Sequence, residues 1–119
     1  MTFEEYVKIY EKKAEPYTLE PGYTLYFDEN HGFITYKKMQ DTLLVDHCCS
    51  VNDLPWMIKK AQEIAKEQGC VYLATLTCRS ARAYIRRGAP SVMKEWHLDL
   101  SLSGYRKNGK FYWCFIVKI

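Results

Sequence analysis

Residues 41–89 decide the fold of this chain, and they read DTLLVDHCCSVNDLPWMIKKAQEIAKEQGCVYLATLTCRSARAYIRRGA. The hydrophobic periodicity changes several times along this stretch. It predicts a strand over Thr42–Cys48, an amphipathic helix over 53–68, a second strand over Val71–Leu76 and a short basic helix from Ser80 to Arg87. Strands and helices that alternate in this way are typical of a βαβα unit.

The helix over 53–68 has clear signals at both ends. Asn52 or Asp53 is placed to accept hydrogen bonds from the free N–H groups of the first turn, and Pro55 is tolerated there. Gly69 can adopt the left-handed conformation that ends a helix. One face of the helix is apolar and consists of Leu54, Met57, Ile58, Ala61, Ile64 and Ala65. The run 71–76 is almost entirely apolar, which predicts a central strand covered on both faces.

The rest of the chain adds one helix and several strands. A helix over 2–13 is predicted by apolar residues at helical spacing and by a capping box between Thr2 and Glu5. The remaining predicted strands are Tyr23–Phe27, Phe33–Met39, Val92–Leu102 and Phe111–Val117. The element order is therefore α-β-β-β-α-β-α-β-β. It predicts a single α+β domain over residues 1–119, with its sheet-and-helix core over 22–119.

Composition and charge argue against several classes of protein. The 119 residues suffice for one core, and the net charge of +3 is weaker than nucleic-acid binders usually show. No apolar run approaches the roughly 18 residues that a membrane helix needs, and the first residues lack a secretory pattern. The five cysteines include no C-x-x-C pair, so we expect reduced thiols in a cytoplasmic protein. Neither a membrane nor a nucleic acid is an expected partner.

The segment TCRSARAYIRRGA, residues 77–89, carries a family resemblance. Tyr84 lies four residues before Gly88, while Thr77, Ser80 and Ala89 stand where the family pattern has Asn, Ala and Phe. The segment and the element order resemble the GNAT superfamily of N-acyltransferases, whose pattern here is roughly N-x-x-A-x-x-x-Y-x-x-x-G-F. The resemblance implies a mixed, mostly antiparallel, centrally splayed sheet with helices on both faces. It also implies acetyl-CoA as the acyl donor and Tyr84 as the acid that protonates the departing thiolate.

The turn before the 53–68 helix departs from the family pattern. In the superfamily this turn reads Q/R-x-x-G-x-G/A, and its glycines let backbone N–H groups approach the pyrophosphate of CoA. Here residues 51–56 read VNDLPW. Asp53 adds a negative charge beside the expected phosphates, and Pro55 removes one N–H donor, so we predict weak CoA binding. The layout is similar to that of short GNAT-like proteins of phages and prophages, including a small internal virion protein.

Several residues are candidates for contacts with the acyl donor. By the resemblance, strand amides near Cys48–Ser50 hold the thioester carbonyl, so Cys49 and Ser50 are candidate donor-binding residues, and Asn52 belongs to the turn that faces the pyrophosphate. Arg79 and Arg82 share one stripe of the short basic helix. They would meet either the 3′-phosphate of CoA or a nucleic-acid backbone. The other interpretation of these arginines is a solvated basic face.

His47 is the candidate general base for the acceptor amine, because its ordinary pKa suits proton transfer near neutral pH. Asp46 is a second candidate, but neighbours on a strand point to opposite faces, so at most one is expected to face the site. A purely structural role is the other interpretation of His47. No metal site is expected, because His47, Cys48 and Cys49 are consecutive strand residues that cannot converge on one ion.

Two functions follow from these observations. The first is acetyl-CoA-dependent N-acyltransfer to an amine, with Tyr84 and His47 as catalytic residues. The second is a non-catalytic phage or prophage protein that uses the same fold for protein–protein or virion-assembly contacts, which the missing glycines favour. The expected partner is accordingly a small-molecule amine or another protein, in the cytoplasm or in a virion.

Overall fold

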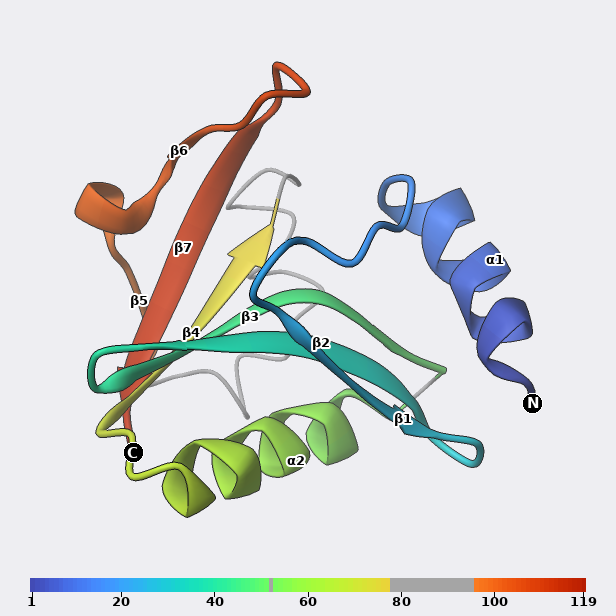
Figure 1. Cartoon of the computed structure of the whole chain (residues 1–119), viewed down its shortest axis with the longest axis horizontal. Coiled ribbons are helices and arrows are strands. Elements are labelled where there is room, and N and C mark those ends of the chain that lie inside the picture. Colours follow the sequence, from blue (N-terminus) through green and yellow to red (C-terminus); the bar gives the residue numbers. More distant parts are fainter. Residues whose placement is uncertain (52, 78–95) are drawn as a thin grey trace.

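One sheet organises the computed structural model, which describes residues 1–51, 53–77 and 96–119 (Figure 1). Within these residues seven strands are ordered β1-β2-β3-β4-β7-β5, and β6 pairs with β7. The strands are β1 (Thr24–Asp28), β2 (Gly32–Met39), β3 (Thr42–Ser50), β4 (Tyr72–Thr77), β5 (His97–Leu98), β6 (Gly104–Tyr105) and β7 (Phe111–Lys118). The helices are α1 (Phe3–Lys13), α2 (Leu54–Glu67) and the 3-10 turn η1 (Leu100–Leu102). The predicted mixed, mostly antiparallel α+β fold is confirmed.

The sheet divides at its centre. Its parallel pair, β3 with β4, is in register only over Thr42–Val45 and Tyr72–Thr75. Beyond these four pairs β3 continues to Ser50 alongside β2, and β4 continues to Thr77 alongside β7. Figure 1 shows the two strands diverging from their shared start near the C-terminus. The predicted central splay is therefore present, and it begins at Val45.

Helices cover opposite faces of the sheet. Ile34 of β2 belongs to the core beneath α2, together with Ala65. The preceding residue, Phe33, packs with Tyr6 of α1 and with Cys49. Because consecutive strand residues point to opposite faces, α1 and α2 must lie on different sides of the sheet. Within the described residues, no helix combines the length and apolar character needed to cross a bilayer.

Strand β4 is the central strand that its apolar run predicts. It lies between β3 and β7, and the side chains of Leu73 and Ala74 have no exposed surface. These two neighbours belong to different core clusters, one on each face of the sheet. The short basic helix expected over residues 80–87 lies outside the described residues.

The long strand predicted over Val92–Leu102 is wrong in its second half. Residues 92–95 lie outside the described residues, and only His97–Leu98 form a strand, β5. The Asp99 side chain then accepts the backbone N–H of Ser101 at 2.9 Å and begins η1. Side chains of Asp and Ser that bond to nearby backbone compete with a strand ladder, and here they end it.

Truncating Leu73 should test the central position of β4. We expect Leu73→Ala to lower the free energy of unfolding by about 2–5 kcal/mol, because it leaves a cavity in a core without exposed surface. Val71, just before the strand, is 39% exposed, and Val71→Ala should cost about 0.5 kcal/mol or less. Urea unfolding of both variants would measure the difference, and equal losses would contradict the assignment.

Candidate functional site

A β-bulge at the splay shapes the site. The register between β2 and β3 shifts by one residue, so that Thr35 lies opposite both Asp46 and His47. The Thr35 hydroxyl accepts the His47 N–H at 2.8 Å and donates to the His47 carbonyl at 3.1 Å, which fixes the bulge. As a result Asp46 and His47 both line one pocket. The expectation that only one of them faces the site is wrong, because strict alternation fails at a bulge.

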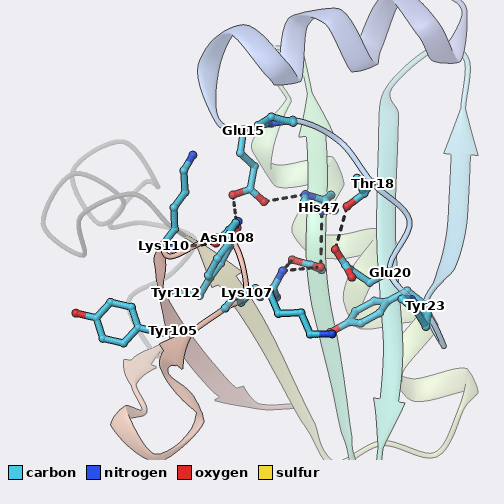
Figure 2. Close-up of a pocket in the computed structure, with 14 residues that line it drawn as sticks. Glu15, Thr18, Glu20, Tyr23, His47, Tyr105, Lys107, Asn108, Lys110 and Tyr112 are labelled. Atoms are coloured by element: carbon cyan, nitrogen blue, oxygen red, sulfur yellow. Dashed lines mark hydrogen bonds and ion pairs between the residues drawn. The ribbon is translucent and has the colours of Figure 1, made fainter.

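The pocket has a volume of about 820 Å³ and opens where β3 leaves β4. Three segments form its wall: the loop after α1 (residues 15–23), the bulge, and the turn between β6 and β7 with the start of β7 (residues 105–112). Figure 2 shows Glu15 reaching from the loop toward both His47 and Tyr112. A volume of this size is typical of small-molecule sites.

Three ionisable side chains meet at the floor of this pocket. Glu15, Asp46 and His47 are at most 5% exposed, and their side-chain ligand atoms lie within 4.8 Å of one another. His47 Nδ1 lies 2.6 Å from the Tyr10 hydroxyl and 3.2 Å from Glu15 Oε1. The imidazole is therefore held from the α1 side by one phenol and one carboxylate.

Glu15 is itself held by β7. The Tyr112 hydroxyl donates to Glu15 Oε2 at 2.5 Å and accepts from the Asn108 side-chain amide at 3.0 Å. Burial raises the pKa of Tyr112 to about 12, and the hydrogen bond to Glu15 adds to the effect. The phenol thus stays protonated and acts as a donor to the carboxylate.

Asp46 is paired with Arg106. One guanidinium nitrogen lies 2.9 and 3.0 Å from the two carboxylate oxygens, and the guanidinium carbon lies 3.9 Å from the centre of the Tyr112 ring. Burial raises the pKa of Asp46, while His47 and Arg106 oppose that rise. Burial also disfavours the charge of Arg106, but the neighbouring carboxylate outweighs it and raises the arginine pKa.

His47 Nε2 is the reactive position of this cluster. It is shielded from solvent and makes no hydrogen bond within the described residues. Its nearest ionic contact is Asp46 Oδ2 at 3.8 Å, beyond hydrogen-bonding distance. The Glu15 carboxylate can only accept at Nδ1, and the Tyr10 hydroxyl, 2.6 Å away, can also accept there, so we assign the tautomer with its proton on Nδ1. That tautomer leaves the lone pair of Nε2 available to take a proton.

Glu15, Asp46 and His47 could also be metal ligands. No local sequence pattern indicates this combination. Their donor atoms are close enough for one ion. However, Arg106 already neutralises Asp46, and Tyr112 and His47 already occupy the two oxygens of Glu15. Each ligand atom would have to exchange a present partner for an ion, so the cluster is better suited to holding protons than a metal.

The residues predicted to contact the acyl donor are placed only in part. Tyr84, Asn52, Arg79 and Arg82 lie outside the described residues. Cys49 and Ser50, the other two residues predicted to bind the donor, lie on β3 within the described residues. Cys49 packs under α1, its thiol donates to the Tyr6 carbonyl at 3.7 Å, and burial raises its pKa, so it is an inert thiol. The Ser50 hydroxyl is buried and has no hydrogen-bond partner within the described residues.

The start of α2 does not fit a pyrophosphate. Asp53 is the N-cap, and its carboxylate accepts the Trp56 N–H at 3.2 Å, one of the groups that a phosphate would use. Pro55 has no N–H to offer. The other carboxylate oxygen of Asp53 lies 3.8 Å from Nε2 of His31, whose ring stacks on Trp56 with centroids 4.8 Å apart. A built-in anion therefore lies at the helix start where the resemblance to the GNAT superfamily implies a phosphate.

Comparison with protein-family models found no match, and comparison with curated proteins found none either. Solved structures do match. The ribosomal-protein-S18-alanine N-acetyltransferase from Escherichia coli is similar with a TM-score of 0.62, at 11% identity over 95% of this chain and 84% of that one. The chain has a GNAT-like fold.

Two further GNAT-like structures support this statement. Ard1 from Thermoplasma volcanium gives a TM-score of 0.60, at 11% identity over 100% of this chain and 94% of that one. A Bacillus subtilis acetyltransferase, crystallised in complex with CoA, gives 0.53 at 14% identity over 82% and 74% of the two chains. At these identities the likeness establishes the fold alone.

Four residues of the site have no sequence signal that singles them out. Tyr10 reads as part of an apolar helix stripe, Glu15 as a loop residue, and Arg106 and Tyr112 as members of a polar turn and a closing strand. Their contacts join residues up to 97 positions apart. These residues could have been suggested only by a predicted sheet that places the turn before β7 next to the β3 bulge.

The Tyr112–Glu15 contact should appear in the titration of Tyr112. With ¹³C-labelled tyrosine, the NMR signal of Tyr112 should titrate at about 12 in the wild type and lower in Glu15→Gln, because the charge that disfavours the phenolate is gone. Since the folded state favours the neutral phenol, its stabilisation is complete below pH 10 and is lost as pH rises toward about 12. Glu20→Gln, at the same pocket, is the control. An unchanged titration in Glu15→Gln would contradict the contact.

Proposed function

We propose that this protein transfers an acyl group from a thioester to a primary amine. The observation that carries the proposal is the shielded lone pair of His47 Nε2 at the floor of a large pocket, at the point where the sheet splays. The GNAT-like fold supports the reaction class, since the similar solved structures include N-acetyltransferases. In the overall reaction a C–N bond forms and the C–S bond breaks. An ammonium group that enters the pocket loses two protons, the first to His47 and the second in the transfer itself, and one proton ends on the departing thiolate.

His47 is the base in this proposal. An ammonium group that enters the pocket loses a proton to Nε2, and the free amine is then a nucleophile. The imidazolium that results is stabilised at Nδ1 by the Glu15 carboxylate, 3.2 Å away. Asp46, 3.8 Å from Nε2, supplies a second negative charge on the other side of the ring. A base flanked in this way gains a proton without leaving an unbalanced buried charge.

The residue proposed to protonate the departing thiolate lies outside the described residues. Tyr84 is our proposed acid for the departing thiolate, on the strength of the family resemblance alone. The donor would be an acyl-CoA, and the similar Bacillus subtilis acetyltransferase was crystallised in complex with CoA. Within the described residues, the Trp56 N–H at the start of α2 is already used by Asp53 and is not free for a phosphate.

Replacing His47 should separate catalysis from a scaffold function. We expect His47→Asn to reduce acetyl transfer to amines by roughly 10²–10⁴-fold, the usual contribution of a positioned base. The exposed His97 on β5 is the matched control, and His97→Asn should leave turnover unchanged. Turnover would be followed by thiol release from acetyl-CoA, with circular dichroism to confirm folding.

Two outcomes would count against this function. Equal turnover in His47→Asn and the wild type would remove His47 from the mechanism. No turnover in the wild type with any amine would favour the second function, a phage or prophage protein that uses the fold for assembly contacts.

CoA should bind weakly, and Asp53 should be the reason. We expect a dissociation constant above the micromolar range by calorimetry, because a carboxylate at the helix start repels the pyrophosphate. Asp53→Gly should tighten binding, whereas Asp41→Gly, on the exposed turn between β2 and β3, should not. Micromolar or tighter binding by the wild type would refute the argument.

A further inference from the structure

The Arg106–Asp46 ion pair restricts which amines can reach His47. Asp46 is 1% exposed at its side chain and Arg106 is 26% exposed, so the carboxylate lies inside and the guanidinium lies toward the pocket. Nε2 of His47 is likewise shielded from solvent. An amine therefore reaches Nε2 only if the side chains at the floor move, and Arg106 is the outermost of them.

Simple amines would leave this ion pair unbalanced. An ammonium group that takes the place of Arg106 beside Asp46 satisfies the carboxylate, but it leaves the guanidinium without its counter-ion. The Arg106 side chain is 26% exposed, so the displaced guanidinium is only partly solvated and is less stable without its counter-ion. A ligand that carries both charges avoids this cost, since its anionic group pairs with Arg106 while its ammonium group pairs with Asp46.

The rim of the pocket also favours an anion. Lys107 and Lys110, from the same turn as Arg106, line the pocket at exposed positions. The carboxylates of Glu15 and Asp46 lie deeper, at the buried floor. Glu20 also lines the pocket and is half-buried, so the exposed charges of the lining are cations and its carboxylates are buried or half-buried. This arrangement matches a molecule that enters with its ammonium group first.

We infer that the acceptor is a small amine that also carries a carboxylate or a phosphate, and that it binds by inserting between Arg106 and Asp46. This inference rests on the proposed function only for the fate of the amine, which His47 Nε2 deprotonates. The binding mode itself depends on the Arg106–Asp46 pair, on the rim lysines and on Nε2, which has no hydrogen-bond partner among the described residues.

Matched amines of similar length test the inference. With acetyl-CoA as donor, 3-aminopropanoate and 2-aminoethyl phosphate would be compared with propylamine and 1,3-diaminopropane, each corrected for its fraction of free amine. We expect kcat/KM for at least one anionic amine to exceed that for propylamine by roughly 5-fold or more, the effect of leaving one partly exposed charge unpaired. The carboxylate and phosphate arms show which anion fits better. Equal values for all four amines would overturn the inference.

Variants of the ion pair show whether Arg106 is responsible. Arg106→Gln should abolish the preference for anionic amines. If this single variant is unstable, the double variant Asp46→Asn, Arg106→Gln leaves no buried unpaired charge and should abolish the preference too. Lys118→Gln removes one positive charge at the opposite end of β7 and should keep the preference. If the double variant keeps the preference for anionic amines, residues other than Arg106 and Asp46 cause it, and the inference is overturned.

A binding measurement separates this inference from the proposed function. Without acyl donor, 3-aminopropanoate or 2-aminoethyl phosphate should bind more tightly than propylamine by calorimetry, and Arg106→Gln should remove the difference. This result with no turnover would uphold the ligand class and refute acyl transfer. Turnover of propylamine equal to that of the anionic amines, with equal binding, would uphold acyl transfer and refute the ligand class.

Discussion

The β-bulge at Thr35 is the constraint on which the site depends. In a regular strand Asp46 and His47 would point to opposite faces, and one of them would enter the core on the α2 side. The bulge turns both toward the same face, immediately after β3 loses its pairing with β4. The Thr35 hydroxyl holds this geometry by bonding to both backbone groups of His47. A single side chain thus decides that two ionisable groups share one pocket.

Charge balance explains why so many polar groups can be buried there. Two carboxylates and an imidazole in a dry environment would be costly without partners. Arg106 neutralises Asp46, Tyr112 donates to Glu15, and Tyr10 lies at hydrogen-bonding distance from His47. These partners come from α1, the turn before β7 and β7 itself, so the sheet's two halves are joined through the site as well as through the short β3–β4 pairing.

The sequence predicts the frame of this protein well because local chemistry determines it. Capping residues and apolar periodicity place α1 and α2 within a residue or two, and the apolar run before Thr77 places β4. The same approach fails over 92–102, where Asp99 forms local hydrogen bonds that alternation does not reveal. Of the site it finds only the β3 residues, and it misjudges their orientation, because a bulge depends on the register of the neighbouring strand.

The distance in sequence between the members of the site affects how the protein folds. Glu15 and Tyr112 are 97 residues apart, and Asp46 and Arg106 are 60 apart, whereas the hairpins β1–β2 and β2–β3 join neighbours. Closing the long loops is entropically costly, so local hairpins form before such contacts do. The polar cluster is therefore completed only when β7 docks on β4. In a partly folded chain β3 can already pair with β2, but Glu15 and Asp46 do not yet have their partners Tyr112 and Arg106.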